Sequence, residues 1–242
     1  MTLQAIGFDF DDTIMERELA EVQAQAQEFV KIWGGNSTQI AKKVFAELRG
    51  RPPRMNDYFA AAKRVPTNGD YKKFEPVFLD ARESIFLKFS RKLATKGVIK
   101  FLKGLGKEKM FLFIISGSPV EKIIMALEKM GVDPRIFSQI NMSRQKAQTL
   151  KEVLQTKGIN PRECLFIGDS KLDHTAATEV GTHFIGIRPR RSERQHNELT
   201  DRNARVLNSF SRMDKVLKEY DNHLGFNIRE HILAERARRR LK

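Results

Sequence analysis

Short apolar segments alternate with amphipathic helical segments through the second half of the chain. Residues 110–115, 164–168 and 184–187 are apolar runs of strand length, and stretches with helical spacing separate them. Such runs, without a polar alternation, are typical of parallel strands that helices cover on both faces. Residues 3–10 form a similar run near the N-terminus. The alternation predicts an α/β fold with a doubly wound, mostly parallel sheet.

A long, mostly helical insertion separates the first two predicted strands. Apolar side chains in residues 16–33 recur at spacings of three and four, which places them on one face of a helix. Asn36 is a suitable N-cap for a second helix. Residues 50–76 are expected to be loop-rich, because they hold several breakers of regular structure, among them Pro76.

The formal net charge of +14 is concentrated in two regions. Residues 16–105 hold 18 basic and 10 acidic residues, and residues 188–242 hold 15 and 8, whereas the remainder holds 11 and 12. Positive surface favours anionic partners, so nucleic acid is a candidate partner of the insertion and the tail. The alternative is a solvated basic surface without a dedicated partner.

These observations suggest a division of the chain into three parts. We expect a core of residues 1–15 plus 104–221, a helical domain of residues 16–103 and a basic C-terminal extension of residues 222–242. The longest strongly apolar run is too short to span a bilayer, and the N-terminus lacks a secretory signal. A single cysteine excludes an internal disulfide. We therefore expect a cytoplasmic protein that does not enter a membrane.

Reactive side chains follow the predicted strands. Asp9 and Asp11 occupy alternate positions at the end of the first strand and can therefore point into one cleft. In open α/β sheets the carboxyl ends of the strands meet at one edge, where chemistry gathers. Carboxylates held together repel one another, so a cation is expected among them. The residues expected around this edge are Asp9, Asp11, Ser116, Gly117, Lys146, Asp169 and Asp173.

The segments that contain these residues resemble, in order, the four motifs of haloacid-dehalogenase-like (HAD) phosphatases. The matching residues are Asp9-Phe-Asp11-Asp-Thr13, Ser116, Lys146 and Gly168-Asp169-Ser-Lys-Leu-Asp173. The insertion falls where this family places its C1 cap, as in the phosphoglycolate-phosphatase-like branch. The resemblance implies a Rossmann-like sheet with an inserted helical cap.

The resemblance also implies a reaction, a Mg²⁺-dependent hydrolysis of a small phosphorylated metabolite. Asp9 would attack the phosphorus and form an aspartyl-phosphate, and Asp11 would act as general acid and then as general base. Ser116, Gly117 and Lys146 would bind the phosphate, with Lys151 as the alternative to Lys146. The metal ligands would come from Asp9, the carbonyl of Asp11 and Asp169, with Asp173 supporting the site.

Alternatives remain open for both substrate and activity. Asp11 favours phosphate esters over haloacids, because a leaving halide needs no proton. Asp12 departs from the glycine that many family members carry at this position. The phosphatase could instead act on nucleotides or nucleic-acid phosphate ends. The remaining alternatives are a phosphomutase, which shares the first step, and a non-catalytic binding protein on the same fold.

Overall fold

The structure, a computed structural model, describes residues 3–48, 53–88, 91–107, 110–188, 199 and 204–223. The basic extension predicted for residues 222–242 lies outside these residues, apart from its first two positions. Among the described helices, none is both long and apolar enough to cross a membrane.

Within the described residues, six parallel strands form one sheet in the order β3-β2-β1-β4-β5-β6. The order places β1 between β2 and β4, with crossover connections on both sides. The predicted Rossmann-like α/β fold with a parallel sheet is therefore confirmed. The strands are β1 Ala5–Phe8, β2 Phe111–Ser116, β3 Gln139–Met142, β4 Cys164–Gly168, β5 His183–Ile187 and β6 Arg205–Leu207.

The register of the three central strands aligns their carboxyl ends. Phe8, the last residue of β1, is level with Ile114 in β2 and with Ile167 in β4. Each strand then continues for only one or two residues before the chain turns. The polar residues that follow these strands therefore emerge at the same edge of the sheet.

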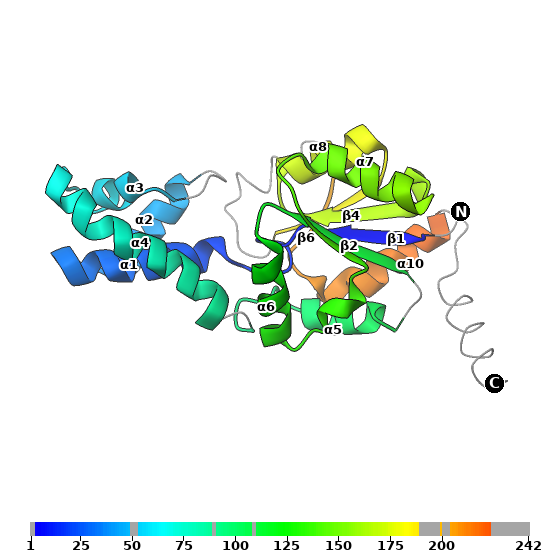
Figure 1. Cartoon of the computed structure of the whole chain (residues 1–242), viewed down its shortest axis with the longest axis horizontal. Coiled ribbons are helices and arrows are strands. Elements are labelled where there is room, and N and C mark those ends of the chain that lie inside the picture. The colour runs from blue at the N-terminus through cyan, green and yellow to red at the C-terminus, as the bar shows by residue number, and fades with distance from the viewer. Residues whose placement is uncertain are drawn as a thin grey trace.

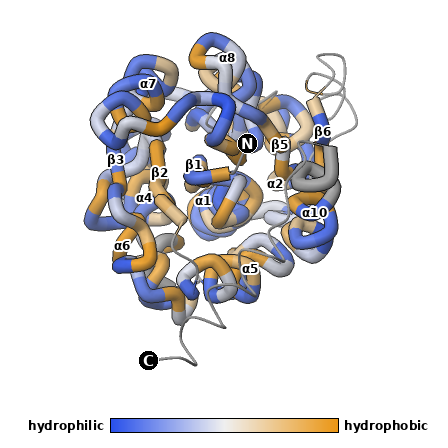
Figure 2. The backbone as a smooth tube through the Cα atoms, turned by 90° about the vertical axis from the view of Figure 1, so that its right-hand side faces the viewer, coloured by the Kyte–Doolittle hydropathy of each residue, from blue (hydrophilic) through white to orange (hydrophobic). Residues whose placement is uncertain are grey.

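Helices cover both faces of the sheet (Figures 1 and 2). On one face, apolar side chains of α5, α6 and α10 pack with Ile6 and Phe8 of β1. On the other face, α7 and α8 pack with Phe113 and Phe166, whose side chains alternate in direction with those of their strand neighbours. These helices are α5 Val98–Leu105, α6 Val120–Met130, α7 Lys146–Lys157, α8 Lys171–Val180 and α10 Met213–His223.

Four helices of the insertion extend away from the sheet, at the left of Figure 1. They enclose a hydrophobic cluster of their own, which is rich in aromatic rings and includes Phe29, Tyr58 and Phe74. Because α5 packs on the sheet instead, we propose that the boundary between insertion and core lies after α4. The four helices are α1 Glu18–Trp33, α2 Ser37–Glu47, α3 Met55–Ala61 and α4 Asn68–Lys88.

The prediction that residues 50–76 are loop-rich was wrong, whereas the N-cap role of Asn36 is confirmed. The Asn36 side chain accepts a hydrogen bond from the Gln39 backbone N–H at 3.0 Å. Two helices, α3 and the first part of α4, occupy the supposed loop, and Pro76 lies inside α4. Phe74 and Phe78 on either side of Pro76 are buried against Tyr58. This aromatic packing offsets the helix-breaking tendency of proline.

Candidate active site

Asp9 lies at the centre of the site because it extends β1 by one residue. Its backbone N–H donates to the Ile167 carbonyl oxygen at 2.8 Å, which fixes the residue between two strands. The Asp9 side chain is buried, and its Oδ2 accepts a 3.4 Å hydrogen bond from the hydroxyl of the fully buried Thr13. The Asp9 carboxylate is thus held in place from both sides.

Lys146, the first residue of α7, joins two of the carboxylates. Its Nζ lies 2.7 Å from Asp9 Oδ1 and 2.5 Å from Asp173 Oδ1. Burial alone would lower the pKa of Lys146, but the two carboxylates more than offset this effect and the pKa is raised. The side chain therefore carries a fixed positive charge. Lys151, the alternative considered from the sequence, is exposed on α7.

Asp169 and Asp173 complete an acidic group with Asp9. One carboxylate oxygen from each residue lies within 4.8 Å of the others, and all three residues are buried. Ser170 caps α8 and donates from its backbone N–H to Asp173 Oδ2 at 2.9 Å. Gly168 permits this approach, because a Cβ at that position would lie 2.4 Å from the Asp173 Cβ.

The charge balance of this group favours a bound cation. Burial has the largest influence on the pKa of Asp9, which is raised well above its ordinary value, and Lys146 opposes the rise. The neighbouring carboxylates of Asp173, Asp169 and Asp11 raise the pKa further. The Lys146 ammonium contacts two of the three buried carboxylates, and oxygen donors of this kind are the ligands that Mg²⁺ takes in proteins.

Asp11 points to a different set of partners. Its Oδ1 accepts a hydrogen bond from the Arg17 guanidinium at 3.0 Å, and its Oδ2 accepts one from the Ser118 hydroxyl at 2.6 Å. The Ser116 hydroxyl, also predicted for the site, donates to Asp11 Oδ2 at 3.3 Å. The carboxylate of Asp11 therefore does not belong to the acidic group of Asp9, Asp169 and Asp173. The metal ligand predicted from the sequence was the backbone carbonyl of Asp11, and that part of the prediction is unaffected.

Asp12 has a backbone conformation that favours glycine. Its φ is +58°, in the left-handed region, where glycine has no steric penalty and aspartate is among the better-tolerated alternatives. The Asp12 carboxylate accepts a hydrogen bond from the Glu18 backbone N–H at 3.0 Å. This bond links the turn after β1 to the start of α1.

Sequence reasoning missed three residues that contact the site, among them the buried Arg188, whose Nε donates to the Asp169 carbonyl oxygen at 2.6 Å. Arg17 was not singled out, yet its guanidinium contacts both Asp11 and the Ser118 hydroxyl, the latter at 3.1 Å. Ser118 and Glu121 have the spacing of a capping box, but no side-chain cap is present at the start of α6. Pro119 precedes α6 without a side-chain cap, since the Ser118 hydroxyl is turned toward Asp11. Nothing local in the sequence distinguishes the two uses of that hydroxyl.

Gly117 adds space rather than a side-chain contact. It follows β2 and is exposed, and a Cβ at its position would meet no atom within 4 Å. The backbone here lies beside the buried Ser116, whose Oγ accepts from the Ser118 backbone N–H at 3.1 Å. The turn after β2 therefore faces the same opening as Asp11.

The fold and the four strand-end motifs define a haloacid dehalogenase-like enzyme core. The chain belongs to the haloacid dehalogenase-like hydrolase family, whose model matches residues 6–187. The protein is therefore a hydrolase of this family. No curated protein matches the chain.

Solved structures with the same fold cover nearly the whole chain. A HAD family hydrolase from Deinococcus radiodurans R1, with bound phosphate and sodium, is 20% identical, has a TM-score of 0.66, and covers 90% of this chain and 96% of its own. A predicted phosphoglycolate phosphatase from Haemophilus somnus 129PT is 17% identical (TM-score 0.58; 90% and 99% covered). A β-phosphoglucomutase from Clostridium difficile is 14% identical (TM-score 0.58; 92% and 99% covered).

Proposed function

We propose that the protein is a Mg²⁺-dependent phosphomonoesterase that hydrolyses a small phosphorylated metabolite through an aspartyl-phosphate on Asp9. The observation that carries this proposal is the separation of two carboxylates. Asp9 is fixed at the sheet edge by Lys146, while Asp11, two residues later, faces two serine hydroxyls and Arg17. This separation supports a role for Asp9 as nucleophile and a role for Asp11 in proton transfer.

The first half of the proposed reaction moves the phosphoryl group to Asp9. An oxygen of the Asp9 carboxylate forms a bond to phosphorus, and the bond between phosphorus and the ester oxygen breaks. Asp11 in its acid form gives its proton to the departing oxygen, which leaves as an alcohol. Lys146 and Ser116 offset the negative charge of the phosphoryl oxygens during the transfer.

The second half of the reaction returns Asp9 to its starting state. Asp11, now a carboxylate, removes a proton from a water molecule as that water attacks the aspartyl-phosphate. The bond between phosphorus and the Asp9 oxygen breaks, and inorganic phosphate leaves. Asp11 ends protonated, as it began, so the cycle is balanced.

Asp9, Asp169 and the Asp11 carbonyl would hold Mg²⁺, with Asp173 supporting the site. When bound, the ion would neutralise charge on the phosphoryl group and on the buried carboxylates. Because burial and the neighbouring carboxylates raise the pKa of Asp9, a further cation would help to keep this nucleophile ionised.

Other activities have less support in the described residues. The acid at Asp11 has no use in the displacement of a halide, which argues against dehalogenation. A non-catalytic role would not require Asp9, Lys146 and Asp173 to converge within hydrogen-bond distance. Action on nucleic-acid ends rests on net charge, and the basic extension that motivates it lies outside the described residues.

Release of inorganic phosphate from an aryl phosphate, with Mg²⁺ and with EDTA, tests the proposal. We expect the native protein to release phosphate only when the metal is present. Asp9→Asn should lower the rate of phosphate release at least about 1,000-fold, because the proposed covalent step needs the Asp9 carboxylate. Asp214→Asn, which changes an exposed carboxylate in α10, should keep full activity. Turnover by a correctly folded Asp9→Asn protein would refute the mechanism.

A further inference from the structure

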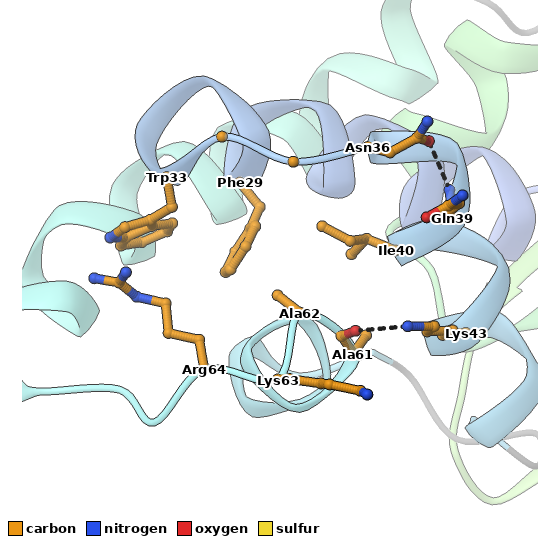
Figure 3. Close-up of a pocket in the computed structure, with 12 residues that line it drawn as sticks. Phe29, Trp33, Asn36, Gln39, Ile40, Lys43, Ala61, Ala62, Lys63 and Arg64 are labelled. Carbon is orange, nitrogen blue, oxygen red and sulfur yellow. Dashed lines mark hydrogen bonds between the residues drawn. The ribbon is translucent and has the colours of Figure 1, made fainter.

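A cavity of about 520 Å³ lies in the helical insertion rather than among the carboxylates (Figure 3). Phe29 and Ile40, both buried, contribute apolar side chains from α1 and α2, and Trp33 lies beside Phe29 with 4.7 Å between ring centroids. Volumes of about 300–1,000 Å³ are typical of pockets for small organic ligands. The cavity thus has the size of such a pocket, and aromatic side chains form part of its wall.

The exposed rim of the cavity is positively charged. Lys43 of α2 and Lys63 and Arg64, which follow α3, line it, and none of its twelve lining residues is acidic. The three cations come from two separate segments, and Arg64 lies beside Trp33 in Figure 3. Cations around a concave site concentrate anionic ligands.

The walls of the cavity are already held in position. Asp70, at the start of α4, accepts hydrogen bonds from Trp33 Nε1 at 3.0 Å and from Arg64 at 3.1 Å. Arg64 also lies over the Trp33 ring, 5.4 Å from its centroid. Lys63 has a φ of +56°, a conformation that a residue with a long side chain adopts rarely and that turns the chain at this rim. A ligand would therefore meet a largely ordered site.

The cavity is remote from the carboxylates of the sheet edge. Arg17, which precedes α1, contacts Asp11, whereas Trp33 is the last residue of the same helix. A helix of 16 residues is about 24 Å long, so α1 separates the two regions by roughly that distance. A small substrate cannot occupy both regions at once.

We propose that this cavity is a second binding site, for a small organic anion that carries a flat apolar ring. The ring lies against the partly exposed Trp33, next to Ile40, and the anionic group lies near Lys43 and Lys63. A mononucleotide has both features and the appropriate size. This inference is independent of the reaction proposed at Asp9.

Titration of the full chain with AMP, adenosine or inorganic phosphate tests the proposal. Calorimetry measures the affinity, and the fluorescence of Trp33, the chain's single tryptophan, reports on the cavity. We expect AMP to bind and to change the fluorescence of Trp33. The calorimetric and the fluorescence titrations should have the same midpoint. Adenosine and phosphate each lack one half of the recognised chemistry, so each should bind at least about tenfold more weakly.

Matched variants locate the site. The double variant Lys43→Gln, Lys63→Gln should weaken AMP binding about tenfold or more, because two charged contacts are lost. Lys42→Gln removes the same charge from the neighbouring exposed position of α2, outside the lining of the cavity, and should change affinity less than twofold. Asp9→Asn should leave AMP binding at the cavity intact, whatever it does to turnover.

Three results would overturn the proposal. The first is the absence of AMP binding, and the second is AMP binding without a change in Trp33 fluorescence. The third is equal affinity of the native protein and the double lysine variant. A different result is binding of an oligonucleotide, with the same loss of affinity in the Lys42→Gln variant as in the double lysine variant. That result would assign the lysines to a general nucleic-acid surface.

Discussion

Two carboxylates two positions apart have acquired different surroundings in this site. Asp9 is buried next to Lys146, whereas the Asp11 side chain is about one quarter exposed and paired with Arg17. Arg17 also lies 3.4 Å from Glu21, which in turn lies 3.1 Å from Arg82 of α4. Burial lowers the pKa of Arg17, but Asp11 and Glu21 outweigh it and the pKa is raised. A permanent charge in the insertion therefore holds the proposed acid.

We predict that Arg17→Met lowers turnover by misplacing Asp11. The loss should be about 10- to 100-fold for an alkyl phosphate, whose leaving oxygen needs a proton, and much smaller for an aryl phosphate with an acidic leaving group. Steady-state kinetics with both substrates measures the difference, and Arg17→Lys should recover part of it. Arg135→Met, at a side chain 90% exposed, is the control. Equal losses on both substrates would exclude a positioning role.

The start of α4 shows how one carboxylate organises an element. Asp70 accepts hydrogen bonds from the Thr67 backbone N–H at 3.0 Å and from the Thr67 hydroxyl at 3.1 Å, as well as from Trp33 and Arg64. The bond from the Thr67 backbone is the main cause that lowers the pKa of Asp70 to about 2, from an ordinary value of 3.8. The carboxylate thus begins α4 and ties it to α1.

A stability experiment follows from this lowered pKa. Because the folded pKa lies below the unfolded one, the ionised Asp70 stabilises the fold above about pH 4, and this contribution is lost as the pH falls toward 2. Asp70→Asn should therefore lower the free energy of unfolding at pH 7, and its difference from the native protein should shrink below pH 4. Urea unfolding followed by Trp33 fluorescence measures both.

Asp80→Asn is the control for this experiment, because Asp80 is an exposed carboxylate of the same helix. It should leave the free energy of unfolding nearly unchanged at pH 7. If Asp70→Asn destabilised the protein equally at pH 7 and at pH 2.5, the ionised form of Asp70 would not be the source of the effect.

At the scale of the whole molecule, two apolar units meet through polar contacts around the site. The aromatic cluster of α1–α4 is separate from the clusters on the two faces of the sheet. Arg17 joins them at Asp11, and Glu83 of α4 joins them at Lys122 of α6, with 2.8 Å between the charged atoms. The Glu83–Lys122 pair is largely exposed and therefore weak, whereas the Arg17–Asp11 pair is mostly buried.

We predict that Mg²⁺ stabilises the protein through the acidic group at the sheet edge. Binding to the folded state alone contributes about 2.7 kcal/mol at 100 times the dissociation constant, which corresponds to a rise in melting temperature of roughly 5–10 °C. Thermal unfolding with Mg²⁺ and with EDTA measures the shift. Asp169→Asn should abolish it, and Asp214→Asn, at an exposed position, should keep it. An equal shift in both variants would place the metal elsewhere.

The parallel sheet and the common edge of Asp9, Ser116 and Asp169 could be predicted from the sequence. Uniformly apolar runs specify buried strands, and polar residues directly after such strands must emerge where parallel strands end. The capping of α2 by Asn36 was equally accessible, because a cap joins residues three positions apart. These features depend on short stretches of chain, which is why the sequence by itself determined them.

Other features were decided only by the tertiary structure. Asp11 accepts a hydrogen bond from Ser118, 107 positions away, and the contact that selects Lys146 over Lys151 joins it to Asp9 across 137 positions. The helix around Pro76 depends on aromatic rings that α1 and α3 supply. A serine near a helix start has the same local sequence whether or not it caps the helix, and a proline has the same local sequence whether it ends a helix or lies within one. Contacts between distant segments decide between these uses, because burial and charge pairing then outweigh local preference.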